Sequence, residues 1–245
     1  MTSTAKISTD KTSTNKTSTP KRGRGKRAAV RFGRPPKELA GEVDERVLDA
    51  AREIFLEHGF EGASIDEIAQ AARSGKQTIY ARFRNKRELF KAVVMRDLTS
   101  RIAELGRVVP SGTTIEQRFV SAGTFMLESA LVQDRVALMR LGIAEAQRFP
   151  DLASNVGRMA YQLTAEVGAR VIGEMTQSDE LGRLTAFAPE RLETTARHFL
   201  NLVVVPFLLR SLFEENLDVL RGEMGAHVAS SVAFFLAACR NGGVS

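Results

Sequence analysis

Apolar residues recur every three or four positions along most of the chain after residue 42, and this spacing places them on one face of an α-helix. Between Val43 and His58, for example, one such stripe contains Val47, Ala50, Ile54 and Phe55. No run alternates apolar and polar residues as a half-buried strand does. The pattern therefore predicts an all-α protein. The first helix is expected near residues 43–58, followed by two short helices between 64 and 83. Longer helices are expected near 85–109, 114–131, 133–148, 151–176, 189–216 and 218–240.

Helix-capping residues divide the first part of this pattern. Gly59 is expected to stop the first helix in a left-handed conformation. Ser64 with Glu67, and Asn85 with Glu88, have the spacing of side chains that cap a helix N-terminus. Ser74 with Gln77 has the same spacing, so Ser74 is expected to cap the second short helix.

The helices group into two expected domains. Residues 41–94 are expected to form a three-helix helix-turn-helix domain, and residues 95–245 a C-terminal helical bundle. The helix that begins at Asn85 links them, and the sequence from Pro110 to Gly112 ends that helix. Pro206 lies inside the helix expected at 189–216 and should kink it.

The two short helices have the arrangement of a motif whose second helix enters the DNA major groove. At the start of that second helix, Gln77 can pair with adenine, Lys76 with guanine, and the methyl group of Thr78 can contact thymine. Residues 73–91 contain seven Lys or Arg and one Glu, a dense positive face that includes Arg73. Tyr80 and Arg82 are placed to contact phosphates, as is Lys86 at the start of the next helix. The alternative is a solvated charged face, but these basic residues cluster on the turn and second helix, which favours DNA.

The net charge of +6 is unevenly distributed along the chain. Residues 1–40 contain 11 Lys or Arg and 2 Asp or Glu, a net of +9, whereas the rest has a net of −3. Residues 2–21 are polar pentapeptide repeats, so we expect a disordered basic arm over residues 1–40. Arg34, between Gly33 and Pro35, partly matches a minor-groove AT-hook, although a phosphate-contacting arm is the favoured interpretation.

Composition narrows the class of protein further. The chain has one cysteine, Cys239, in an apolar run typical of a packed thiol, and no signal peptide, which together favour the cytoplasm. The most apolar run, Phe199 to Leu209, is shorter than the ~20 residues of a membrane span. The histidines at 58, 198 and 227 lack metal-site spacing, and we find no nucleophile, zinc or phosphate-loop motif. We therefore expect no enzyme activity, no metal and no cofactor.

The segment from about Val47 to Val94 resembles the N-terminal domain of the TetR family of bacterial transcriptional regulators. The resemblance is carried, in order, by residues 51–60, 64–69, 76–83 and 85–90. It implies DNA contacts for Ser64, Lys76, Gln77, Thr78, Tyr80 and Lys86. The chain departs from the family in the turn, where the family commonly has Ala-Gly-Val-Ser and this chain has Ala72-Arg73-Ser74-Gly75. The serine is displaced by one position, and the turn glycine is displaced as well.

The same resemblance implies that the C-terminal half contains an internal ligand cavity and that its last two long helices form a homodimer. Apolar stripes on those helices are consistent with this: Leu200, Val203, Val204, Leu208 and Leu212 on one, and Val228, Ala229, Val232, Phe235 and Leu236 on the next. Some of this apolar surface must also pack within the single chain. Candidate ligand contacts are apolar or amphipathic side chains of the central helices, for each of which core packing is the alternative. They are Phe125, Met126, Met139, Tyr161, Met175 and Phe199.

The sequence thus predicts a DNA-binding regulator. The favoured form is a repressor that releases a palindromic operator in double-stranded DNA when a small-molecule effector binds. The alternative is a nucleoid-associated or architectural protein that binds DNA through its arm without sequence preference.

Overall fold

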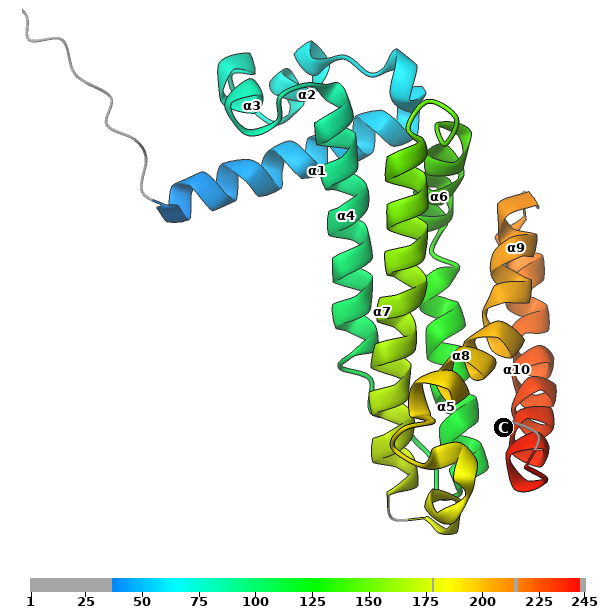
Figure 1. The fold of residues 1–245 in the computed structure, drawn as a ribbon. Coiled ribbons are helices and arrows are strands. Elements are labelled where there is room, and N and C mark those ends of the chain that lie inside the picture. Colours follow the sequence, from blue (N-terminus) through cyan, green and yellow to red (C-terminus); the bar gives the residue numbers. More distant parts are fainter. Residues whose placement is uncertain (1–36, 178, 214–215, 243–245) are drawn as a thin grey trace, which may run out of the picture. The chain divides into compact units, whose positions relative to one another are not determined.

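The computed structural model describes residues 37–177, 179–213 and 216–242, and side chains from residue 41 onward. The part described is all-α, as predicted (Figure 1). The N-terminal helices are α1 (Lys37–Gly62), α2 (Ile65–Ala71), α3 (Lys76–Arg82) and α4 (Lys86–Leu105). The remaining α-helices are α5 (Ile115–Ala130), α6 (Gln133–Ala144), α7 (Pro150–Thr176), α8 (Leu192–Val203), α9 (Val205–Phe213) and α10 (Leu217–Arg240). Two short 3₁₀ helices, Glu180–Arg183 and Thr185–Phe187, occupy the connection that was expected to be irregular.

Two of the expected caps are present. The Ser64 side chain accepts a hydrogen bond from the Glu67 N–H in a complete capping box, and the Asn85 side chain accepts one from the Glu88 N–H. Gly59 is left-handed, with φ 70°, and marks the end of the first helical stretch, although one more turn follows to Gly62. The helix also begins earlier than expected, at Lys37, so residues 37–40 are helical rather than part of the arm.

The cap of α3 differs from the prediction, because its N-cap is Gly75 rather than Ser74. Arg73 takes the left-handed conformation, with φ 49°, and its neighbour Ser74 donates its N–H to the Ala69 carbonyl at 2.9 Å. The chain therefore turns at Arg73 and is extended at Gly75, which has no side chain to cap the helix. The family's spacing is kept, with arginine in the position of its glycine and glycine in the position of its serine.

Two clusters of buried side chains form the core. The first centres on Phe55, Phe60 and Phe90, whose ring centroids lie 5.1 to 6.0 Å apart. It is completed by residues beyond the expected boundary at 94, since Leu138 is buried in it and Phe149 packs against it. The helix-turn-helix domain thus shares its core with α6 and the start of α7.

The second cluster lies among α5, α7, α8 and α10 and is built around Phe119, Phe199 and Phe235. Their ring centroids are 5.1 to 5.5 Å apart, which suits edge-to-face aromatic packing. Gly123 on α5 permits this approach, because an added Cβ would lie 3.0 Å from Val228 and 3.2 Å from Val203. Cys239 is buried nearby, and burial raises the pKa of its thiol to about 11, so it is protonated near neutral pH.

The helix expected at 189–216 is two helices, α8 and α9, which meet at Val204 just before Pro206. Part of the expected dimer stripes was expected to pack within the chain, and in the structure most of their residues do so. Seven of their ten residues are buried within the single chain: Leu200, Val203, Val204, Val228, Val232, Phe235 and Leu236. Leu208 and Leu212 are half-buried, and Ala229 is exposed.

Length and composition alone make two segments candidates for membrane spans, which the sequence analysis did not anticipate. They are Leu192–Phe213, with a mean hydropathy of 1.3, and Leu217–Arg240, with a mean hydropathy of 1.2. Both contribute to the second core cluster, and the first is broken at Val204. Their apolar content is therefore explained in part by packing within the bundle.

Candidate DNA-binding site

The outer face of α3 carries the side chains predicted to read bases. Ile79 is buried and anchors the helix to the first core cluster, with Phe83 packed beside it. Because α3 is held by this side, Lys76, Gln77 and Thr78 are exposed on the other. Tyr80 is 51% exposed, an unusually open position for a large aromatic side chain. The structure thus gathers four predicted contacts on one solvent-facing surface.

The first of these residues has an intramolecular partner. Lys76 forms an ion pair with Asp66 of α2, and both side chains are largely exposed. An exposed pair of this kind contributes little free energy, so a DNA phosphate or base edge can replace the carboxylate at small cost.

Three predicted DNA contacts also hold the domain together. Ser64 forms the α2 capping box, so its hydroxyl is already engaged with Glu67. Arg82 donates to the carboxylate of Asp44 on α1 at 2.8 Å. Their DNA contacts stay predictions, but substituting either residue would also disturb the scaffold.

Lys86 is the third. Its ammonium donates to the carbonyls of Ala63 at 2.9 Å and Glu61 at 3.1 Å, and it lies 4.7 Å from the Phe60 ring centroid. Lys86 therefore fixes the end of α1 against the start of α4. Its predicted phosphate contact likewise stays a prediction.

Arg73 is exposed at the turn between α2 and α3. A non-glycine residue in the left-handed conformation costs about 1 kcal/mol or more. Arg34, the remaining predicted contact, lies outside the described residues.

Phe149, just before α7, connects the helix-turn-helix domain to the bundle. Its ring lies edge-on to Phe60, with the centroids 4.9 Å apart, and the Arg87 guanidinium lies 4.6 Å from its centroid. Arg148 forms an ion pair with Glu61 at the end of α1. Movement at the start of α7 would thus directly shift residues of the first core cluster, which supports the helix-turn-helix.

An apolar cavity lies close to this connection. This cavity, of about 270 Å³, lies between α4, α6 and the first half of α7. Its lining includes Phe90 and Val94 of α4, Met139 of α6, and Phe149 and Val156. We call it the upper cavity.

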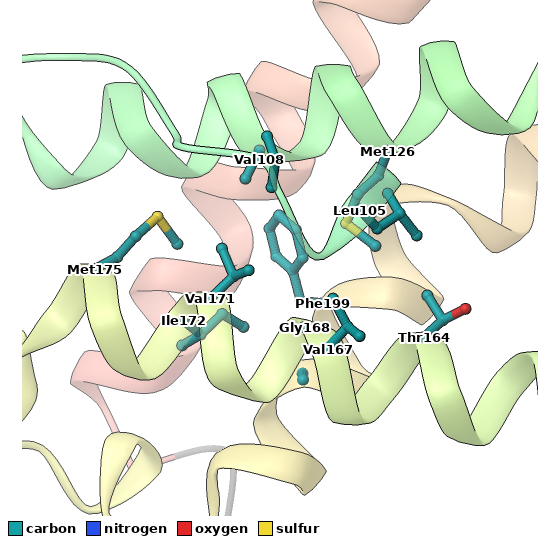
Figure 2. Close-up of a pocket in the computed structure, with 12 residues that line it drawn as sticks. Leu105, Val108, Met126, Thr164, Val167, Gly168, Val171, Ile172, Met175 and Phe199 are labelled. Atoms are coloured by element: carbon teal, nitrogen blue, oxygen red, sulfur yellow. The ribbon is translucent and has the colours of Figure 1, made fainter. Parts of the chain in front are cut away.

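A second cavity lies further along α4 and α7, beside α5 and α8 (Figure 2). We call it the lower cavity. Its volume of about 30 Å³ holds little more than a water molecule. Met126, Met175 and Phe199 line it, and Figure 2 shows their side chains around the same space.

The candidate ligand residues are thus divided. Met139 lines the upper cavity, and Met126, Met175 and Phe199 line the lower one. Phe125 lies on surface grooves, and Tyr161 is exposed, with its hydroxyl 3.2 Å from Asn201 Oδ1. Phe125 and Tyr161 therefore do not line either cavity with the other candidate ligand residues.

The polar lining of the upper cavity was not predicted from the sequence. Asp97 and Arg101 lie on α4, one turn apart, and both face this space. Burial raises the pKa of Asp97, although the guanidinium of Arg135 opposes the shift, and burial lowers the pKa of Arg101. The signal was the presence of charged residues beside the apolar stripe of Val94, Leu98 and Ile102.

Comparison with known proteins gives matches over both halves of the chain. Residues 47–93 match the family "Bacterial regulatory proteins, tetR family", and residues 117–241 match "AefR-like transcriptional repressor, C-terminal domain". The second match alone covers more than half of the 245 residues.

Curated relatives match over part of the chain. The HTH-type transcriptional repressor SCO4008 of Streptomyces coelicolor is 51% identical over 49 residues, which cover 20% of this chain and 26% of that protein. The HTH-type transcriptional regulator UidR of Escherichia coli K12 is 28% identical over 126 residues, covering 51% and 63%. The chain therefore spans less than two thirds of the length of these relatives.

Solved structures match over most of the chain. A TetR-family transcriptional regulator from Mesorhizobium loti superposes with a TM-score of 0.66 at 22% identity, covering 81% of this chain and 97% of the other. The flavonoid-responsive regulator FrrA superposes with a TM-score of 0.58 at 27% identity, with the same coverage. The helix-turn-helix, the bundle and the two family matches agree, and the chain belongs to the TetR family of bacterial regulatory proteins.

Proposed function

We propose that the protein is a cytoplasmic, homodimeric transcriptional repressor that binds a palindromic operator and releases it when a small molecule occupies the upper cavity. The observation that carries the proposal is the exposed face of α3, where Lys76, Gln77 and Thr78 stand at the N-terminal end of a helix anchored by Ile79. This is the end of a recognition helix that reaches base edges. We propose no catalytic activity for it.

The proposed dimer rests on an apolar surface that the single chain leaves uncovered. On α10 an exposed stripe of small residues recurs at helical spacing: Gly222, Ala226, Ala229, Ala233 and Ala237. On the preceding α9, Leu209 is 52% exposed and Phe213 is 87% exposed. Small side chains allow two helices to approach closely, so a second copy of the chain is the natural partner. A two-fold dimer also presents two recognition helices to the half-sites of a palindrome.

The proposed effector response rests on the position of the upper cavity. Phe90 lines the cavity and also lies in the aromatic cluster of the DNA-binding core, 5.1 Å from Phe55 between ring centroids. Phe149 likewise lines the cavity and contacts Phe60. A ligand that favours one arrangement of these rings would shift the population of DNA-binding geometries. The flavonoid response of the similar regulator FrrA supports an aromatic effector here.

The basic segment at the N-terminus, residues 1–36, lies outside the described residues. We propose that its charge adds sequence-independent affinity for DNA phosphates. A nucleoid-associated protein would need only this electrostatic affinity for phosphates. The exposed face of α3 instead favours a protein that recognises a specific base sequence.

Selection from a random DNA pool tests the readout. We expect the wild-type protein to enrich an inverted repeat, and the Gln77→Ala protein to enrich a repeat with relaxed preference at one position in each half. Loss of a bidentate contact to adenine costs about 1–3 kcal/mol of discrimination. Sequencing the enriched pools gives the result directly, and an unchanged consensus would remove Gln77 from the readout.

Arg73 provides a second test, because it occupies a strained position. Arg73→Gly is expected to leave stability unchanged or raise it by up to about 1 kcal/mol, since glycine adopts the left-handed conformation freely. Operator binding should weaken, and the slope of log affinity against log salt should become shallower by about one if Arg73 contacts a phosphate. Arg158→Ala, which removes an exposed arginine of α7, is the control. An identical salt slope for Arg73→Gly and wild type would exclude the phosphate contact.

A further inference from the structure

The upper cavity combines an apolar wall with a small set of ionisable groups. Its apolar lining includes the rings of Phe90 and Phe149 and the side chains of Leu98, Met139 and Val156. The volume of about 270 Å³ is near the lower end of small-molecule sites, so it suits a molecule of one or two rings.

Most of the ionisable groups in this lining already have close ionic partners. Nη2 of Arg135 donates to both carboxylate oxygens of Glu104, at 2.7 and 2.8 Å. Asp97 lies 3.9 Å from the Nε of the same Arg135. Glu145 lies 3.5 Å from Arg148. The charges of these three groups are therefore paired with opposite charges within the protein.

Arg101 is different. Its side chain is half-buried in the same wall, yet it makes no hydrogen bond and no ion pair with any residue in the described ranges. It interacts with Asp97 and Glu104 only through longer-range electrostatics, and burial disfavours its charge. A guanidinium has five N–H donors, and no nitrogen of Arg101 is among the fully buried, unpartnered atoms of the described residues, so its donors stay open to a ligand.

A bound anion would satisfy these donors. A carboxylate matches the planar geometry of a guanidinium and forms two parallel, charge-assisted hydrogen bonds. The side chain of Asp97 does not already pair with Arg101, because the Asp97 carboxylate lies within 4 Å of Arg135 instead. We propose that the upper cavity binds small aromatic carboxylates, with the rings against Phe90 and Phe149 and the carboxylate paired with Arg101. Binding of this ligand is independent of the proposed function, whereas its role in releasing the operator rests on that function.

The proposal is tested by calorimetric binding of three carboxylates, benzoate, 1-naphthoate and biphenyl-4-carboxylate, each beside its neutral amide. On the full-length wild-type protein, we expect at least one carboxylate to bind about tenfold or more tighter than its amide. Arg101→Gln should weaken that carboxylate about tenfold to a hundredfold and leave the amide within about threefold, because only the charge-assisted bonds are lost. Binding of no carboxylate, equal binding of acid and amide, or an unchanged affinity in Arg101→Gln would overturn the proposal.

Gly142 places the site within the cavity. It lines the cavity on α6, and an added Cβ would meet no atom within 4 Å. Gly142→Phe should therefore fill the space and abolish carboxylate binding, while Gly142→Ala should fold and bind nearly as wild type. Undiminished binding to a folded Gly142→Phe protein would place the anion elsewhere and overturn the assignment.

The same samples are assayed for operator release, which keeps the two proposals separate. Carboxylate binding that depends on Arg101 but leaves the operator complex intact would support the anion site and contradict the effector role. Operator binding by a protein with no carboxylate preference would support the DNA-binding regulator and contradict the anion site. Preference for 1-naphthylmethylammonium, lost in Asp97→Asn, would show a cation site instead and overturn the proposal.

Discussion

Replacing Ala229 by glutamate is expected to convert the protein to a monomer whose affinity for its operator is at least about a hundredfold lower. Ala229 is at the middle of the exposed small-residue stripe of α10, where a charge would be buried without a partner in a dimer. Two linked recognition helices bind far more tightly than one, by factors of about 10²–10⁴, because the second contact is intramolecular. Sedimentation gives the mass of the protein, and titration of labelled operator gives the affinity.

The matched control for this experiment is Ala103→Glu, which adds the same charge at an exposed position of α4. It should remain a dimer with ordinary operator affinity. Circular dichroism shows whether the Ala229→Glu chain remains helical, as we expect from its exposure. A folded Ala229→Glu protein that stays dimeric would place the interface on another surface.

The second large effect is expected for Phe90→Ala, which should lower the free energy of unfolding by about 3–5 kcal/mol. The side chain of Phe90 is fully buried, packs against both Phe55 and Phe60, and separates the DNA-binding core from the upper cavity. Its removal would enlarge an existing space, so the surrounding helices have little to collapse onto.

Urea unfolding at a fixed protein concentration measures this loss, since the stability of a dimer depends on concentration. Val109→Ala is the control, because Val109 is 87% exposed and its substitution should change stability by no more than about 0.5 kcal/mol. A loss below about 1 kcal/mol for Phe90→Ala would show that the aromatic cluster is not the structural link between α4 and the DNA-binding domain.

Local patterns predicted most of the fold correctly. The caps at Ser64 and Asn85, the end of the first helix at Gly59 and the break before Pro206 each depend on residues within a few positions of one another. The start of α3 was predicted wrongly, because the positive φ of Arg73 is not encoded by a glycine. The surrounding turn imposes that conformation, and a residue pattern does not show it.

Contacts between distant segments were harder to predict. An apolar stripe shows that a helix face is buried, but not whether it is covered by the same chain or by a second copy. The stripes containing Val203, Val232 and Phe235 supported a dimer without showing which residues pack internally, and all three lie in the core of the single chain. Of the small exposed residues of α10, only Ala229 was among the predicted interface residues, because alanine gives a weak hydrophobic signal.

The candidate DNA contacts could be placed from sequence because a short helix with one buried residue, Ile79, leaves few orientations. The cavities could not. The lining of the upper cavity comes from three helices, and its most informative residue, Arg101, is defined by the absence of a close partner among the described residues. Such a property depends on the whole packing arrangement.

In the proposed function, the exposed face of α3 reads a specific DNA sequence and is presented twice by a dimer. Footprinting of the purified full-length protein on DNA from a selected pool tests it most directly. We predict protection of one short inverted repeat whose half-site centres are about one helical turn apart, roughly 34–36 Å. Uniform protection along the fragment, without preference for any site, would contradict the account and identify a protein that binds DNA through charge alone.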